Sequence, residues 1–171
     1  GSAGCVMAAR LSEDADRSVC LIEAGGQGRG ILVRAPALVA AMAPGRPRIN
    51  NYAFQTVPQP GLNGRRWYQP RGRALGGSSA INAMLYVRGD RRDYDEWADL
   101  GCDGWDWASV LPYFRKAEGN QRGADDLHGA DGPLQVAEQS APRAINEAFI
   151  AAACAQQVRR TEDFNGETQE G

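Results

Sequence analysis

Apolar positions near the start of the chain follow first a helical and then a strand-like pattern. In residues 5–11 (CVMAARL) they recur at helical spacing and predict one apolar face. Residues 12–17 are polar, and residues 18–23 (SVCLIE) form a short apolar run with the length of a buried β-strand. Residues 24–26 (AGG) then turn the chain. Helix, strand and turn in this order predict the latter part of a β-α-β unit.

The rest of the pattern predicts short elements joined by turns. Asp106 is placed to cap a helix, and Pro112 within that helix predicts a kink or a later start. Asn63-Gly64 favours a tight turn within residues 58–66, so we expect a hairpin there. In chain order the predicted elements are a short helix at 36–42, a strand at 51–57, a returning segment at 67–70, a helix beginning within 88–97, the capped helix at 107–118, a strand at 133–137 and an alanine-rich helix at 144–158.

Composition excludes few classes of function. The 171 residues are 43% hydrophobic and 23% charged, which is ordinary for a globular protein. The net charge of -2 gives no electrostatic reason to expect nucleic acid or an anionic membrane as partner. The sequence has no run of about 18 apolar residues, so it predicts no transmembrane segment. Its four cysteines have neither CxxC spacing nor a neighbouring histidine, and we predict buried or incidental thiols without a metal site or disulfide framework.

The amino terminus and Glu23 fit part of a dinucleotide-binding fingerprint. Gly1 and Gly4 would be the second and third glycines of GxGxxG. Glu23 lies 19 positions past Gly4, close to the spacing of the acid that binds ribose hydroxyls. A simple helix cap at residues 1–4 is the alternative. Because the preceding strand and first glycine are missing, we expect the chain to be a fragment of a longer protein.

A second glycine-rich stretch occupies residues 72–89 (GRALGGSSAINAMLYVRG). Its adjacent glycines, Gly76 and Gly77, allow positive φ and close approach of another group. Ser78 and Ser79 add hydroxyl donors, and successive backbone N–H groups in such a turn can bind an anion. Alone, the stretch is equally a turn between two structural elements. Together with the amino-terminal glycines, it predicts that residues 76–79 and 1–4 face one phosphate-binding groove.

These motifs resemble the glucose-methanol-choline (GMC) family of flavin-dependent oxidoreductases, in its bacterial choline- and alcohol-dehydrogenase-like branch. The resemblance covers the whole chain. Three groups of segments carry it. GSAG at 1–4, AARL at 8–11 and LIEAG at 21–25 are similar to the family's FAD fingerprint without its first strand. GRALGGSSAIN at 72–82, with Tyr86, Gly89 and Asp95, is similar to the family's first signature, and Trp105, LPYF at 111–114 and HGADGP at 128–133 also match the family.

The resemblance implies an α/β fold. Residues 1–125 would form an incomplete Rossmann-like FAD-binding domain whose first strand is missing, and residues 126–171 the truncated start of an α+β substrate-binding domain. FAD would be held non-covalently, because Ile81 occupies the position where some relatives attach FAD through a histidine.

The resemblance also implies roles for individual residues. Ser2 and Ala3 would lie against the FAD diphosphate, and Glu23 would hold the adenosine ribose with Ala24 beside it. The glycine loop would pass over the flavin and contact its phosphates, ribityl chain and ring. The complete set of implied cofactor-binding residues is Gly1, Ser2, Ala3, Gly4, Glu23, Ala24, Ala74, Gly77, Ser78, Asn82, Ala83, Met84 and Leu85.

The implied activity is FAD-dependent dehydrogenation or oxidation of a small alcohol, with hydride transfer to flavin N5. The family's catalytic histidine lies far downstream, so we expect no catalytic residue here and an inactive chain when it is expressed alone. His128, the only histidine, is predicted to be a turn or hydrogen-bonding residue. Two alternatives are a lyase on the same flavoprotein scaffold and a NAD-dependent dehydrogenase, which would not need the second glycine loop.

We expect a cytoplasmic protein. Association with the membrane periphery stays open, as does a signal peptide, because the amino terminus is truncated.

Overall fold

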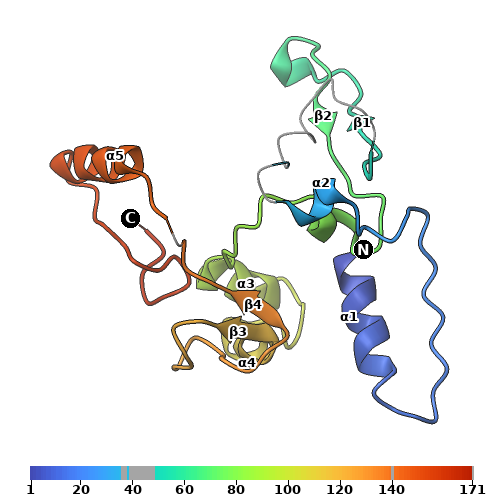
Figure 1. The fold of residues 1–171 in the computed structure, drawn as a ribbon. Helices are drawn as coiled ribbons and strands as arrows, with labels where there is room; N and C mark the ends of the chain where they lie inside the picture. Colours follow the sequence, from blue (N-terminus) through green and yellow to red (C-terminus); the bar gives the residue numbers. More distant parts are fainter. Residues whose placement is uncertain (36–37, 39–48, 140, 171) are drawn as a thin grey trace. The chain divides into compact units, whose positions relative to one another are not determined.

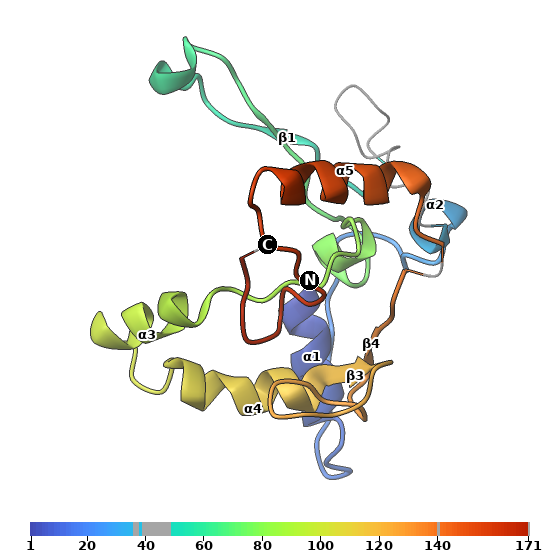
Figure 2. The ribbon, with the colours of Figure 1, turned by 90° about the vertical axis from the view of Figure 1, so that its left-hand side faces the viewer.

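The computed structural model describes residues 1–35, 38, 49–139 and 141–170. The chain divides into two compact units, Gly1–Leu85 and Tyr86–Gly171, drawn in Figures 1 and 2. Both units mix short helices and strands, in agreement with the predicted α/β class. The boundary between the units falls inside the expected FAD-binding domain. Because compactness follows contacts and not function, the functional domains 1–125 and 126–171 stay a prediction.

The first unit begins with α1 (Ser2–Leu11), which confirms the helix predicted from residues 5–11. All of its side chains lie at or near the surface, since none is fully buried. A single helical turn, α2 (Ile31–Arg34), follows Gly30 and was not predicted. The helix predicted at 36–42 lies, apart from Leu38, outside the described residues.

The strand predicted at residues 18–23 is wrong for this structure. The stretch has no regular secondary structure, and Ile22 is 89% exposed. A strand needs a neighbour to exchange backbone hydrogen bonds with. No described residue forms a β-ladder or bridge with this stretch. The apolar pattern is present, but none of the described residues pairs with it.

The predicted hairpin is confirmed, with shorter strands than expected. Strand β1 (Phe54–Gln55) pairs antiparallel with β2 (Tyr68–Gln69), so that Phe54 lies opposite Gln69. The 3-10 turn η2 (Pro60–Leu62) and left-handed Asn63 reverse the chain. Gly64 follows with φ of 74°, a conformation that favours glycine.

The glycine-rich stretch lies at the centre of the first unit. It contains the 3-10 helix η3 (Gly77–Ala80), which follows the left-handed Gly76. Isolated bridges join Gly26 to Ala74 in parallel and Asn51 to Gly72 in antiparallel orientation. Ala74 is fully buried between these segments. The stretch therefore connects the amino-terminal segments to the hairpin.

Two capped helices begin the second unit. Helix α3 (Arg91–Asp99) starts with a capping box between Asp90 and Asp93, and hydrogen bonds with Arg92 lower the pKa of Asp90 to about 2. Helix α4 (Trp107–Ala117) starts at the predicted cap, where the Asp106 carboxylate accepts from Ser109 N at 3.0 Å. Hydrogen bonds from the Ser109 hydroxyl and N–H also hold the pKa of Asp106 below its usual range.

Pro112 lies inside α4 without delaying its start. Its missing N–H leaves the carbonyl four residues earlier, at Ala108, without its usual helical partner. Of the two predicted alternatives, a kink or a later start, the later start is wrong, because the Asp106 cap fixes the first turn ahead of the proline.

Tyr94 of α3 forms the aromatic core between the two helices. Its ring centroid lies 5.5 Å from Trp97, 5.6 Å from Trp107 and 5.7 Å from Phe114. Its hydroxyl also accepts a hydrogen bond from Gly89 N at 3.1 Å. One side chain thus joins α3, α4 and the segment before them.

The remaining elements of the second unit are a parallel strand pair and one helix. Strand β3 (Glu118–Asn120) begins where the sequence placed the end of the preceding helix, and it pairs with β4 (Leu134–Val136), within the predicted strand at 133–137. Helix α5 (Ala144–Ala155) confirms the alanine-rich helix and ends three residues before its expected end at 158.

Replacing Tyr94 should separate its two contributions to stability. In the full-length protein we expect Tyr94→Ala to lower the free energy of unfolding by about 3–5 kcal/mol, because it removes a ring packed on three others. Tyr94→Phe keeps the ring and leaves only Gly89 N without its acceptor, so a loss of about 1 kcal/mol is expected. Denaturant titration measures both, and equal losses would contradict the packing role.

Candidate cofactor site

The amino end of α1 lies against η3, as the sequence predicts for residues 1–4 and 76–79 (Figures 1 and 2). The Ser2 and Ser79 hydroxyls hydrogen-bond to each other. Gly77 is buried with φ of 58°, and a Cβ built on it would lie 2.5 Å from Gly1 Cα. Position 77 therefore requires glycine. This juxtaposition is the centre of the candidate site.

The first turn of α1 presents free backbone donors. Gly1 is the N-cap and offers no side chain to the N–H groups that follow, and no acidic residue lies in the first turn. The first hydrogen bond into the helix runs from Cys5 N to Gly1 O at 3.1 Å. In the described part of the chain, the N–H groups of Ser2, Ala3 and Gly4 have no acceptor. An uncapped helix start of this kind carries partial positive charge and attracts an anion.

Glu23 lies in a turn packed on the same loop. Its Oε1 accepts from Gly25 N at 2.8 Å, while Oε2 accepts no hydrogen bond from any residue that the structure describes. Next to it, Ala24 O accepts from Arg73 Nε at 3.3 Å, and Gly26 O accepts from Leu75 N at 2.8 Å. One carboxylate oxygen is thus held by the turn and the other is available.

The structure gives Ala74 and Ser78 internal contacts. Ala74 is fully buried in the loop. The Ser78 hydroxyl accepts from Gly72 N at 3.2 Å and so braces the loop from within. Both residues shape the backbone that meets α1.

The run Asn82–Leu85 leaves η3 in an exposed turn. Asn82 Oδ1 accepts from Met84 N at 3.0 Å, and Met84 has φ of 59°. Met84, Leu85 and Ala83 are all exposed. Their expected contact with the flavin ring stays a prediction.

Sequence reasoning missed Arg73, and it named Ser79 as a donor of the loop without identifying its partner. The pair Ser78-Ser79 offered two hydroxyls, and only the geometry shows that Ser79 reaches Ser2. Arg73 donates to Ala24 O and lies over the Tyr52 ring at 5.5 Å, so it joins the acid-bearing turn to the hairpin. Its place within the GRALGG segment at residues 72–77 was the available signal in the sequence.

His128 lies in the second unit and is hydrogen-bonded there, as predicted. Its ring is buried, with Nδ1 2.9 Å from Asp125 Oδ1 and Nε2 3.3 Å from Asp163 Oδ2. Both ring nitrogens face carboxylates of the same unit. The four cysteines are free thiols, and three of them, Cys20, Cys102 and Cys154, are exposed, which fits the incidental and not the buried alternative of the prediction.

Comparison with known proteins gives a consistent family assignment. The model of the GMC oxidoreductase family matches residues 1–171. The oxygen-dependent choline dehydrogenase of Rhizobium etli strain CFN 42 is 44% identical over 171 residues, which cover 100% of this chain and 31% of that protein.

Two solved structures have the same fold. Pyridoxine 4-oxidase from Mesorbium loti aligns with a TM-score of 0.85 and 39% identity, over 96% of this chain and 32% of that one. An FAD-dependent oxidoreductase from Chaetomium thermophilum aligns with a TM-score of 0.84 and 30% identity, over 100% of this chain and 31% of that one.

The chain spans about 31% of the length of the curated relatives it matches. The matches indicate FAD as the cofactor. Among the described helices, none has the length and apolar character needed to cross a membrane. The family model covers every residue of the sequence. The chain therefore belongs to the GMC oxidoreductase family.

Proposed function

We propose that the full-length protein is an FAD-dependent oxidoreductase that acts on the CH–OH group of a small alcohol, and that this chain supplies part of its cofactor-binding region. The observation that carries the proposal is the contact of Gly1 and Ser2 with Gly77 and Ser79. Two glycine-rich segments far apart in the sequence converge there on the uncapped start of a helix.

The converging residues fit the diphosphate of FAD. The free N–H groups of Ser2, Ala3 and Gly4 are donors for phosphate oxygens, and the helix start favours negative charge. A Cβ built on Gly1 meets nothing within 4 Å, so the space beside the helix start is open. The hydroxyls of Ser2 and Ser79 add donors at the same place.

Glu23 fits the adenosine ribose. Its free Oε2 can accept from a ribose hydroxyl, while Gly25 N holds Oε1 and orients the carboxylate. Ala24 is fixed next to it by Arg73. The exposed run Asn82–Leu85 is the candidate for contact with the flavin ring, and Ile81 leaves the cofactor without a covalent tether from this position.

When bound, FAD supplies the hydride acceptor for the reaction. The residues of this chain hold and orient the cofactor. A general base for the alcohol proton must lie within hydrogen-bonding reach of the substrate. His128 is buried between two carboxylates and does not meet that requirement.

Choline is the first substrate to test, because choline dehydrogenases lie among the similar proteins. The substrate class of the proposal is a small alcohol, and the electron acceptor is open. We propose a cytoplasmic location for the full-length protein.

The proposed activity is tested on the purified full-length protein. We expect a flavin absorbance spectrum and reduction of an electron-accepting dye that depends on choline or another small alcohol. Free FAD with the same alcohol is the control. A protein without bound flavin, or turnover that requires a nicotinamide cofactor, would contradict the proposal, while alcohol cleavage without dye reduction would favour the lyase alternative.

Removing the Glu23 carboxylate should weaken FAD retention. A charge-assisted hydrogen bond contributes about 1.5–3 kcal/mol, so Glu23→Ala in the full-length protein should weaken FAD binding roughly ten- to hundredfold. Glu23→Gln keeps an acceptor for Gly25 N but loses the charge, and it should fall between wild type and alanine. Dialysis followed by flavin absorbance measures retention, and unchanged retention in both variants would count against the ribose role.

Gly77→Ala should disrupt the contact between η3 and α1. The added Cβ would overlap Gly1, and the positive φ of Gly77 adds strain of about 1–2 kcal/mol for any other residue. Gly64→Ala is the matched control, because Gly64 also has positive φ but its Cβ would meet nothing within 4 Å. We expect strong FAD loss only in Gly77→Ala. Similar FAD loss in both would attribute the effect to backbone strain alone.

A further inference from the structure

A pocket in the first unit contains an arginine whose charge has no acidic partner among the described residues. The pocket has a volume of about 450 Å³ and is lined by residues 51–55, at the start of the hairpin, and by Arg73. None of these lining residues is acidic. Arg73 therefore gives this wall of the first unit a positive charge that is open to a ligand.

The guanidinium of Arg73 is only partly used by the protein. Its Nε donates to Ala24 O at 3.3 Å, and the group lies over the Tyr52 ring, 5.5 Å from the ring centroid. Within the part of the chain that the structure describes, Nη1 and Nη2 donate no hydrogen bond and Arg73 forms no ion pair. The fork of an arginine matches the two oxygens of a carboxylate. The free edge of Arg73 is thus suited to a carboxylate.

An aromatic pair continues the wall of the pocket. The Tyr52 and Phe54 rings are stacked, with centroids 5.1 Å apart and planes 7° from parallel. Phe54 is 52% exposed, so much of its surface is in contact with water. Flat rings pack favourably on such a surface in offset or edge-to-face geometry. The same pocket therefore offers a cation and an apolar ring.

Asn51 fixes this wall before any ligand binds. It is 3% exposed, and its Oδ1 accepts from Ala53 N at 2.9 Å and from Arg71 N at 3.0 Å. Its Nδ2 donates to the Tyr68 hydroxyl at 2.8 Å. One buried side chain thus joins the pocket to both strands of the hairpin region and to the glycine-rich stretch. A site held in this way loses little freedom when it binds.

The backbone of the pocket is also strained. Asn50 and Ala53 have φ of 53° and 51°, in the left-handed region that residues other than glycine seldom adopt. Arg73 N donates to Asn50 O at 2.8 Å, so the strained segment and the arginine share a backbone hydrogen bond. Such strain persists only where surrounding contacts enforce it, and it is common at binding sites.

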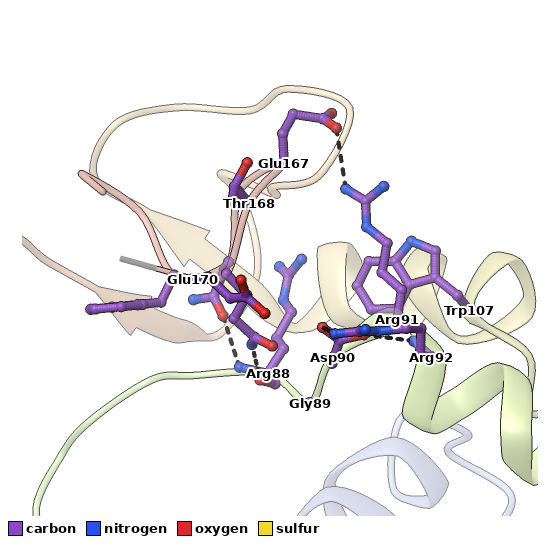
Figure 3. A pocket seen from close by; sticks show the side chains of 13 residues that line it. Arg88, Gly89, Asp90, Arg91, Arg92, Trp107, Glu167, Thr168 and Glu170 are labelled. Atoms are coloured by element: carbon purple, nitrogen blue, oxygen red, sulfur yellow. Dashed lines mark hydrogen bonds and ion pairs between the residues drawn. The ribbon is translucent and has the colours of Figure 1, made fainter. Parts of the chain in front are cut away.

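A pocket in the second unit shows the opposite arrangement of charge (Figure 3). It has a volume of about 300 Å³, and three arginines line it, Arg88, Arg91 and Arg92. Each has an acidic partner, in the same order Glu118, Glu167 and Asp90. The backbone N–H and carbonyl of Arg88 are bound as well, by the side chains of Asn165 and Gln169. The positive charges of that pocket are already balanced, whereas that of Arg73 is not.

We propose that the pocket at Arg73 is a binding site for a small aromatic carboxylate. The two carboxylate oxygens accept from Arg73 Nη1 and Nη2, and the aromatic ring packs against Phe54. The charge and the ring are recognised by different residues, so each can be removed separately. This inference is independent of the proposed oxidation of an alcohol.

The test measures binding of benzoate to the purified full-length protein, with excess FAD present, by isothermal titration calorimetry. Benzamide keeps the ring without the charge and should bind roughly ten- to hundredfold more weakly, the range of a charge-assisted hydrogen bond. Acetate keeps the charge without the ring and should bind about two- to tenfold more weakly. The excess of FAD removes any effect of cofactor loss on the comparison.

Variants then locate the bound benzoate. Arg73→Gln should weaken benzoate binding roughly ten- to hundredfold, and Phe54→Leu about two- to tenfold. Arg65→Gln is the matched control, because Arg65 is another exposed arginine whose Nε donates to a backbone carbonyl, Leu62 O at 3.1 Å, and it does not line the pocket. We expect wild-type affinity in this control. If Arg73→Gln fails to fold by circular dichroism, Phe54→Leu and the benzamide comparison decide.

Three results would overturn the inference: no heat of binding at millimolar benzoate, equal binding in Arg73→Gln and Arg65→Gln, or benzoate on the apoprotein that added FAD displaces. The last result would assign the pocket to the cofactor. A protein that binds benzoate through Arg73 but takes up no FAD would instead overturn the proposed function and support the present inference.

Discussion

Backbone contact between Gly1 and Gly77 is the constraint on which the first unit depends. Because Gly77 has no Cβ, the start of α1 can reach η3, and the Ser2 and Ser79 hydroxyls come together. The turn at Glu23 packs on the preceding residues of the same loop. The start of α1, the turn at Glu23 and the loop around η3 are therefore held together by the same contacts. A change in those contacts displaces all three.

The second unit has a different kind of support. Its aromatic core around Tyr94 is small, and much of the remaining interior is polar, with Arg88, Glu118 and His128 buried. Buried charges are stable only with complete partners. Glu118 meets this demand by accepting from Arg88, from Asn120 Nδ2 at 3.0 Å and from Gly129 N at 3.3 Å. In this unit, pairing of charged groups holds the loops in place. In many proteins a larger apolar core has that role.

Local chemistry could be predicted from the sequence, and pairing across long separations could not. The Asp106 cap and the turn at Asn63-Gly64 depend on neighbouring residues, and both are found where expected. The strand at 18–23 fails because its formation depends on a partner that no local pattern reveals. For the candidate site, the convergence of the two glycine segments was predictable from their shared need for a phosphate, but the choice of Ser79 over Ser78 depended on η3 geometry. The sequence pattern predicted Glu118 to be the end of a helix, because its ion-pair partner, Arg88, lies 30 positions away and has no part in the local pattern.

The long separations around Arg88 also have a consequence for synthesis on the ribosome. Glu118 is 30 positions after Arg88, whereas Asn165 and Gln169 are 77 and 81 positions after it. At roughly 5–20 residues per second, translation supplies the two amides several seconds after the arginine and its carboxylate partner. During that interval the chain contains both partners of the Arg88–Glu118 pair but not yet the two amides that bind the backbone of residues 86–88. The order of synthesis thus makes the charge partner of Arg88 available before the hydrogen-bond partners of its backbone.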